Sequence, residues 1–169
     1  MKADALIVRA TSVAGKGCRY GLGCGGFDPS RTHPCDDAML CDCSGFVAWA
    51  IGEPRHTNDP WYRSFNGGWV ETTAIVRDCE TPYGLFAPVA TLRARPGDLL
   101  VYGDRKGALG RMRQGHVGIC TDVGSKGPLT VVHCSRGNQR RAQDAILETD
   151  VSWWTLADGI VARCALIDP

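Results

Sequence analysis

The order of the apolar segments along the chain restricts its fold more than any other feature. Patterns typical of helices come first: apolar residues recur at helical spacing from Ala3 to Ala14, and Asp42 precedes an almost continuous apolar stretch that ends at Ile51. Short segments typical of strands come later, at 98–102, 116–123, 129–135 and 158–167. Helices followed by strands predict an α+β domain, with N-terminal helices packed on one face of an antiparallel sheet.

The segment that follows Asp42 should be a buried helix. Its residues from Ser44 to Ile51 are apolar on nearly every side, so no face of this helix is suited to contact with water. The side chain of Asp42 can cap the first turn, and Gly52 and Pro54 end the helix.

We expect a loop on each side of this helix. Residues 17–40 are rich in glycine and proline, which favour irregular turns. Residues 53–72 also lack a clear period and carry four aromatic side chains, which we expect to pack in the core rather than to form a wall against a substrate. These four are Trp61, Tyr62, Phe65 and Trp69.

Length and composition narrow the class of protein. The 169 residues fit a single domain, 1–169, that can bury a core without help from metals. The formal net charge of +1 gives no reason to expect binding to nucleic acid. The chain has no run of apolar residues long enough for membrane insertion. Residues 1–15 make a poor signal peptide, because Arg9 interrupts a short apolar run.

Nine cysteines leave two interpretations open. Either four disulfides leave one free thiol, or all nine are thiols that act as small buried apolar groups. The poor signal peptide favours the second interpretation. A zinc site built from His33, Cys35, Cys41 and Cys43 is disfavoured, since paired ligands in common structural sites are separated by two to four residues. We therefore expect no metal and no cofactor.

Cys43 is the candidate nucleophile, because it stands at the start of the buried helix. The positive end of a helix lowers the pKa of a thiol, and its free backbone N–H groups can hold an oxyanion. The alternative is that Cys43 is one buried cysteine among nine.

His116 and His133 are the candidate base and the residue that orients it. If 124–127 is a four-residue hairpin loop, Val123 pairs with Pro128, and Gly118 lies opposite His133. His133 is then the diagonal neighbour of His116 on the same face of the sheet. Gly118 leaves the space between the two imidazoles open. Thiol, base and orienting group form a triad, and Asn138, in an expected turn, is the alternative orienting residue.

Six segments of the chain form an ordered set. They are Ala5–Gly23, Asp42–Val47, Glu53–Arg55, Arg95–Leu100, Gly115–Ile119 and Val131–His133. Together they resemble the motifs of the NlpC family of cell-wall cysteine peptidases, in the family's own order. The resemblance covers most of residues 5–135. Asp42–Val47 resembles the nucleophile motif, and Gly115–Ile119 resembles the motif of the base.

The resemblance implies a papain-like core with a triad of Cys43, His116 and His133. It implies hydrolysis of amide bonds in the stem peptides of peptidoglycan, in particular the bond between D-glutamate and the diamino acid. It also implies that Tyr20 lines the site, and that Asp42 and Ser44 contact the substrate.

Two segments depart from the family pattern. The cysteine-bearing stretch at about 24–40 is an insertion between Tyr20 and Cys43 that could fold over the site. The segment 104–114 places four basic residues just before His116. We expect it to be a solvated loop, and the alternative is a clamp for the carboxylates of a stem peptide.

Other functions remain open on the same residues. The same thiol chemistry serves N-acetylmuramoyl-L-alanine amidases and acyltransferases, and a disulfide-rich binding module needs no chemistry at all. As a cell-wall hydrolase the protein would be made in the cytoplasm and delivered to the wall by a phage, a secretion system or lysis. Its partners would be peptidoglycan and, in those settings, a phage particle or an immunity or inhibitor protein.

Overall fold

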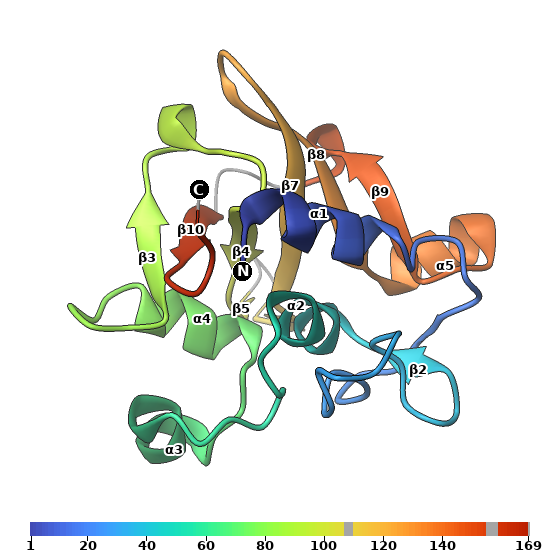
Figure 1. Ribbon diagram of the computed structural model, residues 1–169, viewed down its shortest axis with the longest axis horizontal. Helices are drawn as coiled ribbons and strands as arrows, with labels where there is room; N and C mark the ends of the chain where they lie inside the picture. Colours follow the sequence, from blue (N-terminus) through green and yellow to red (C-terminus); the bar gives the residue numbers. More distant parts are fainter. Residues whose placement is uncertain (107–109, 155–158, 169) are drawn as a thin grey trace.

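A six-stranded sheet forms the centre of the protein. The structure, a computed structural model, describes residues 1–106, 110–154 and 159–168, without the side chain of Trp153. The strand order is β3-β10-β4-β7-β8-β9, and every neighbouring pair is antiparallel (Figure 1). The strands are β3 (Phe86–Val89), β4 (Leu99–Tyr102), β7 (His116–Gly124), β8 (Gly127–Cys134), β9 (Ile146–Asp150) and β10 (Ile160–Cys164).

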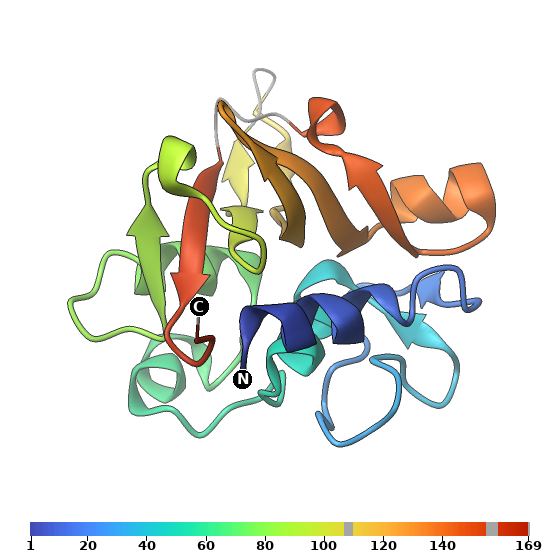
Figure 2. The same ribbon diagram turned by 45° about the horizontal axis from the view of Figure 1, so that its top comes forward.

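The N-terminal helices lie together on one side of this sheet (Figure 2). Helix α1 packs on α2, and both contact β7. The described helices are α1 (Ala3–Thr11), α2 (Cys43–Ile51), α3 (Pro60–Asn66), α4 (Thr72–Asp78) and α5 (Arg136–Ala142), with 3-10 turns η1 (Thr91–Arg93) and η2 (Val151–Trp153). The predicted α+β fold, with N-terminal helices on an antiparallel sheet, is confirmed.

Helix α2 is the buried helix that the sequence predicts. The carboxylate of Asp42 accepts a hydrogen bond from the Gly45 amide at 2.9 Å, which caps the first turn. Gly52 ends the helix in the left-handed conformation, with φ of 87°. All nine residues of α2 are buried, because α1 and β7 cover it and it has no polar face to turn outward.

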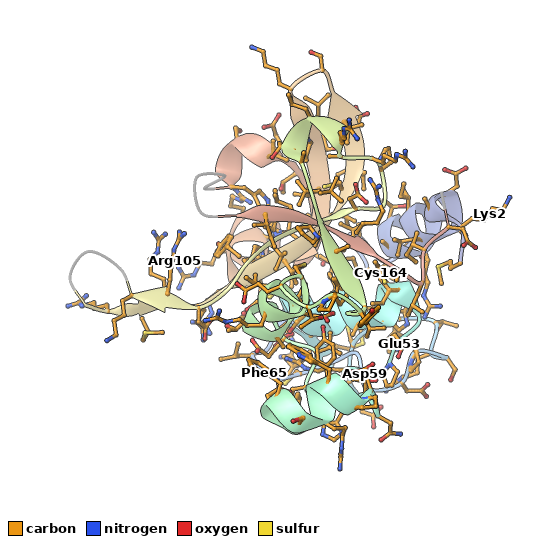
Figure 3. All side chains as sticks on the ribbon, turned by 90° about the vertical axis from the view of Figure 1, so that its left-hand side faces the viewer. Lys2, Glu53, Asp59, Phe65, Arg105 and Cys164 are labelled. Atoms are coloured by element: carbon orange, nitrogen blue, oxygen red, sulfur yellow. The ribbon has the colours of Figure 1, made fainter. Side chains whose placement is uncertain are left out.

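The expectation of a loop at 53–72 is wrong, because α3 lies within it. Asp59 stands at the start of α3 (Figure 3). It accepts hydrogen bonds from the amides of Trp61 and Tyr62, and Pro60 occupies the first helical turn. The cap at Asp59 and the proline after it start a short helix, although the segment has no regular apolar period. The aromatic side chains do not share one role: Tyr62 is fully buried, whereas Phe65 is 45% exposed.

Several further elements were not predicted. Strands β3 and β9 and helices α4 and α5 are short, and their sequences lack a clear alternation or helical period. Two small sheets form inside the expected loops: β1 (Arg19–Tyr20) pairs with β2 (Leu40–Cys41), and β5 (Arg105–Lys106) pairs with β6 (Met112–Arg113). The last predicted strand, 158–167, forms β10 in its described part.

The hairpin of β7 and β8 has the register that the sequence predicts near the two histidines. Val123 pairs with Pro128 and Ile119 pairs with Val132, which sets Gly118 opposite His133. The turn itself is shorter than expected, because Gly124 pairs with Gly127 and only two residues remain between them. A register irregularity between Cys120 and Val123 does not reach the histidine end of the strands.

The segment 24–40 packs against α2. A side chain at Gly26 would clash with the backbone of Gly45, so the two chains approach as closely as glycine allows. The indole of Trp49 donates a hydrogen bond to the carbonyl of Arg31 at 2.8 Å. The segment 24–40 therefore supports α2, the helix that begins with the candidate nucleophile Cys43.

All nine cysteines are free thiols in the structure, and eight of them are buried. The sulfur atoms of Cys35 and Cys18 are in direct contact, 2.6 Å apart, between the segment 24–40 and the residue before β1. Within the described ranges, no group of three or more His, Cys, Asp or Glu side chains is arranged to hold a metal ion. None of the described helices is long and apolar enough to cross a membrane.

Candidate active site

Cys43 is the first residue of α2 and faces the start of β7. Its side chain is buried, with 5% of the residue exposed. The backbone amide of Val117, the residue after His116, donates a hydrogen bond toward the thiol. The end of the capped helix and the start of β7 therefore bring the thiol beside the strand that carries the candidate base.

Burial changes the expected acidity of this thiol. Burial and, to a smaller extent, the neighbouring Asp42 carboxylate raise the pKa of Cys43 to about 12. The amides of Val117 and Ser44 and the Arg55 guanidinium lower the pKa, but by less. The expectation that the helix N-terminus gives a low thiol pKa is therefore wrong, because desolvation outweighs it.

His116 and His133 contact each other directly. Nε2 of His116 lies 2.7 Å from Nδ1 of His133, a hydrogen-bond distance. This contact leaves Nδ1 of His116 as the nitrogen that can accept a proton from a thiol. Burial lowers the pKa of His116 to about 4, so its imidazole is neutral at pH 7 and can act as a base.

Thr149 extends this chain of hydrogen bonds, and the sequence analysis missed it. Its hydroxyl lies 2.9 Å from Nε2 of His133. When His133 donates from Nε2 to Thr149, its Nδ1 accepts from Nε2 of His116, and Nδ1 of His116 is left unprotonated. Thr149 is two residues from Leu147, the partner of His133 in the sheet, so recognition of β9 would have placed it on the correct face.

Asn138 lies behind His133. Its side-chain amide donates to the carbonyls of His133 at 3.0 Å and Ala145 at 3.2 Å, and lies 3.4 Å from Nε2 of His133. It therefore holds the end of β8 next to Ala145, the residue before β9. The orienting role of either residue stays a prediction.

Trp154 packs on both imidazoles and was also missed. Its ring is stacked on His116 with 4.7 Å between centroids, and it contacts His133 edge-on at 5.3 Å. Tyr102 contacts the indole edge-on at 6.1 Å and also lies beside His116, with 6.2 Å between ring centroids. Because Trp154 follows η2, far from the histidines in sequence, no local pattern could have indicated this contact.

Gly118 provides the space that these rings occupy. A Cβ atom there would lie 2.9 Å from Cβ of His133 and 3.0 Å from the ring of Trp154. We expect Gly118→Ala to destabilise the fold by about 1–3 kcal/mol. We also expect it to lower kcat by about 10²-fold, because His133 must move. Steady-state kinetics and urea unfolding measure both effects.

Gly124→Ala on the same strand is the matched control. The three atoms nearest to the added Cβ would all belong to the flexible, exposed side chain of Leu129, the first of them at 3.2 Å. The two variants differ in position but not in chemistry. Equal kcat values for the two variants would contradict the prediction that activity depends on the absence of a side chain at position 118.

Asp42 and Ser44 build the wall beside the thiol. One oxygen of Asp42 accepts from the Gly45 amide and the Ser44 hydroxyl, and the other from the Gly23 amide at 2.6 Å and Arg55 at 2.7 Å. The motif residue Arg55 is thus the buried partner of the helix cap. Contact of Asp42 and Ser44 with a substrate stays a prediction.

Two hollows open on the site. The larger has a volume of about 580 Å³ and is lined by His116, His133 and Tyr102, with residues of α5. The smaller, of about 150 Å³, is lined by Cys43, Asp42 and Ser44. Tyr20 lines both hollows, and burial raises the pKa of its hydroxyl. None of the described lining residues comes from 24–40, so the insertion does not cover either hollow.

Comparison with known proteins supports the fold. No family model and no curated protein matches the chain. A crystal structure from Staphylococcus aureus, of a protein described as similar to a lipoprotein of the NLP/P60 family, superposes with a TM-score of 0.50 at 16% identity. The chain has an NlpC/P60-like fold. The match covers 99% of this chain and 42% of the staphylococcal protein, so the chain spans less than half of that protein's length.

Proposed function

We propose that the protein is a cysteine peptidase that hydrolyses amide bonds in peptidoglycan stem peptides. The observation that carries the proposal is the contact of 2.7 Å between His116 and His133, with the amide of Val117, next to His116, bonded to the buried thiol of Cys43. The NlpC/P60-like fold and the ordered motifs support the substrate class.

The proposed mechanism starts from an uncharged Cys43 thiol and an uncharged His116 imidazole. Because the pKa of Cys43 is about 12 and that of His116 about 4, thiol and imidazole are both uncharged at pH 7. The thiol proton passes to His116 as the sulfur attacks the amide carbonyl, and the new imidazolium donates through Nε2 to His133. Backbone amides around the start of α2 stabilise the oxyanion.

The second half of the reaction reverses the proton transfer. His116 gives its proton to the leaving amine, which breaks the carbon–nitrogen bond and leaves a thioester on Cys43. Water then attacks the thioester with His116 as base, and the free acid departs. The residues require no metal or cofactor for these steps.

We propose the bond between D-glutamate and the diamino acid as the one that is cut. Digestion of defined muropeptides by the native protein, followed by mass spectrometry, tests this assignment. The expected products are a fragment that ends in D-glutamate and a fragment that begins with the diamino acid. An N-acetylmuramoyl-L-alanine amidase would instead release the intact stem peptide from the glycan, and an acyltransferase would form a new ester or amide. Failure to cut any stem peptide would overturn the proposal.

Delivery to the wall belongs to the same proposal. We place the action of the protein outside the cytoplasm, after transfer by a phage, a secretion system or lysis. A non-catalytic, disulfide-rich binding module has less support, because the structure holds all nine cysteines as free thiols.

A further inference from the structure

Three arginines of α5 line the larger hollow beside the two histidines. They are Arg136, Arg140 and Arg141. Among the residues that the structure describes, the lining of this hollow contains no aspartate and no glutamate. The side of the site that holds the imidazoles is therefore strongly positive.

The position of α5 is fixed relative to the candidate triad. The helix begins directly after β8, where Ser135 caps it by accepting a hydrogen bond from the amide of Asn138 at 3.0 Å. Asn138 in turn is bonded to the carbonyls of His133 and Ala145. The arginines of α5 thus extend from a helix that is anchored at the residue whose imidazole contacts His116.

Arg136 and Arg140 are the two arginines available to a ligand. Both are exposed, and neither forms an ion pair with a described residue. Arg136 lies over the ring of Tyr20, with 5.6 Å from its guanidinium carbon to the ring centroid, so its head group is held at the hollow. A guanidinium offers paired N–H donors that match the two oxygens of a carboxylate.

The hairpin of β5 and β6 adds positive charge near the same hollow. It projects from the body of the molecule (Figure 3). Arg105 at its base lies over the ring of Tyr102 at 5.1 Å, and Tyr102 lines the larger hollow. The smaller hollow has the opposite balance, with Asp42, Glu71 and Asp104 against Arg55.

We propose that Arg136 and Arg140 form a carboxylate-binding wall on the histidine side of the cleft. Through it, the enzyme prefers stem peptides with free carboxyl groups to peptides in which these groups are amidated. The inference rests on the proposed function, because it assigns the substrate's anionic groups to one side of the same site. Amidation removes the negative charge and one acceptor oxygen, so it removes the pairing with a guanidinium.

A matched pair of synthetic stem tetrapeptides tests the wall. One peptide has free carboxyl groups, and the other has the same sequence with these groups as carboxamides. Dissociation constants are measured by calorimetry on Cys43→Ala protein, so that binding is read without cleavage. We expect the free-acid peptide to bind at least tenfold more tightly. In the Cys43→Ala protein that also carries Arg136→Gln and Arg140→Gln, we expect this difference to disappear.

Arg63→Gln with Arg93→Gln is the control for net charge. Both residues are exposed and line neither of the two hollows, and the pair loses the same charge. This control should keep the tenfold preference for the free acid. The proposed carboxylate-binding wall is wrong if the Cys43→Ala protein binds the two peptides with equal affinity. It is also wrong if the preference for the free acid survives the loss of Arg136 and Arg140.

The same peptides separate this inference from the proposed function. If the native enzyme cleaves both peptides with equal kcat/KM, the proposed function stands and the wall fails. If the Cys43→Ala protein prefers the free acid but the native enzyme cleaves neither peptide, the wall stands and the proposed hydrolysis fails. When both hold, loss of the arginines raises KM for the free-acid peptide and leaves its kcat nearly unchanged.

Discussion

Cys43→Ala protein should release no measurable fragments from purified peptidoglycan or from defined stem peptides. Loss of the nucleophile in a triad lowers kcat by about 10⁴-fold or more, because the remaining groups cannot form the acyl intermediate. The assay belongs at pH 7, where His116 is neutral because burial lowers its pKa to about 4. Mass spectrometry of the digest, normalised to enzyme concentration, gives the ratio of rates.

Cys79→Ala is the matched control for this variant. Cys79 is also a buried thiol, 7% exposed, but it lies at the end of α4 and lines neither hollow of the site. We expect it to keep nearly full activity. Thermal unfolding of both variants shows whether each is folded at the assay temperature. Activity of folded Cys43→Ala protein within tenfold of the native rate would contradict the assignment of the nucleophile.

The part of the site that could be predicted rests on local rules. The cap at Asp42 and the apolar stretch after it fixed where the thiol lies on α2. Strand alternation and one turn fixed the relation of His116 to His133, because a shift by one residue would have placed them on opposite faces.

The residues of the site that the sequence analysis missed come from segments distant from Cys43 and His116 in the sequence. Thr149 reaches His133 because β9 pairs with β8, and Trp154 reaches both histidines because η2 follows β9. Neither arrangement can be predicted from a local sequence pattern. Helix α5 follows β8 in a polar, arginine-rich stretch whose period was not evident. The error in the thiol pKa has another cause: the helix end is a local property, but desolvation depends on what covers Cys43 in three dimensions.

The fold comparison gives the arrangement of the helices and strands, whereas the proposed chemistry depends on contacts between individual side chains. At 16% identity the staphylococcal structure indicates how the elements are arranged, but it assigns no chemistry to any side chain. The proposed chemistry rests instead on contacts within this chain, those of His116 with His133 and of His133 with Thr149. A function is therefore best tested at these atoms rather than inferred from the fold.

The buried pair of Arg55 and Asp42 should be the most sensitive point for stability. The two side chains are 2.7 Å apart and only 4% and 2% exposed. Arg55→Met keeps much of the side-chain volume but leaves the Asp42 carboxylate buried without its cation. We expect this change to lower the free energy of unfolding by about 3–5 kcal/mol, measured by urea denaturation. Arg55 also donates to the carbonyl of Cys24 at 2.7 Å, so its loss releases the segment 24–40 as well.

An exposed ion pair gives the matched control. Arg77 and Glu80 are 2.9 Å apart but 57% and 60% exposed, so Arg77→Met should cost no more than about 1 kcal/mol. A loss of stability in Arg55→Met no greater than in Arg77→Met would contradict the role of burial. Adding Asp42→Asn to Arg55→Met should restore part of the loss, because it removes the unpaired charge while keeping an acceptor for the Gly45 amide. Since that cap sets the first turn of α2, the double variant also separates the charge of Asp42 from its hold on the helix that begins with Cys43.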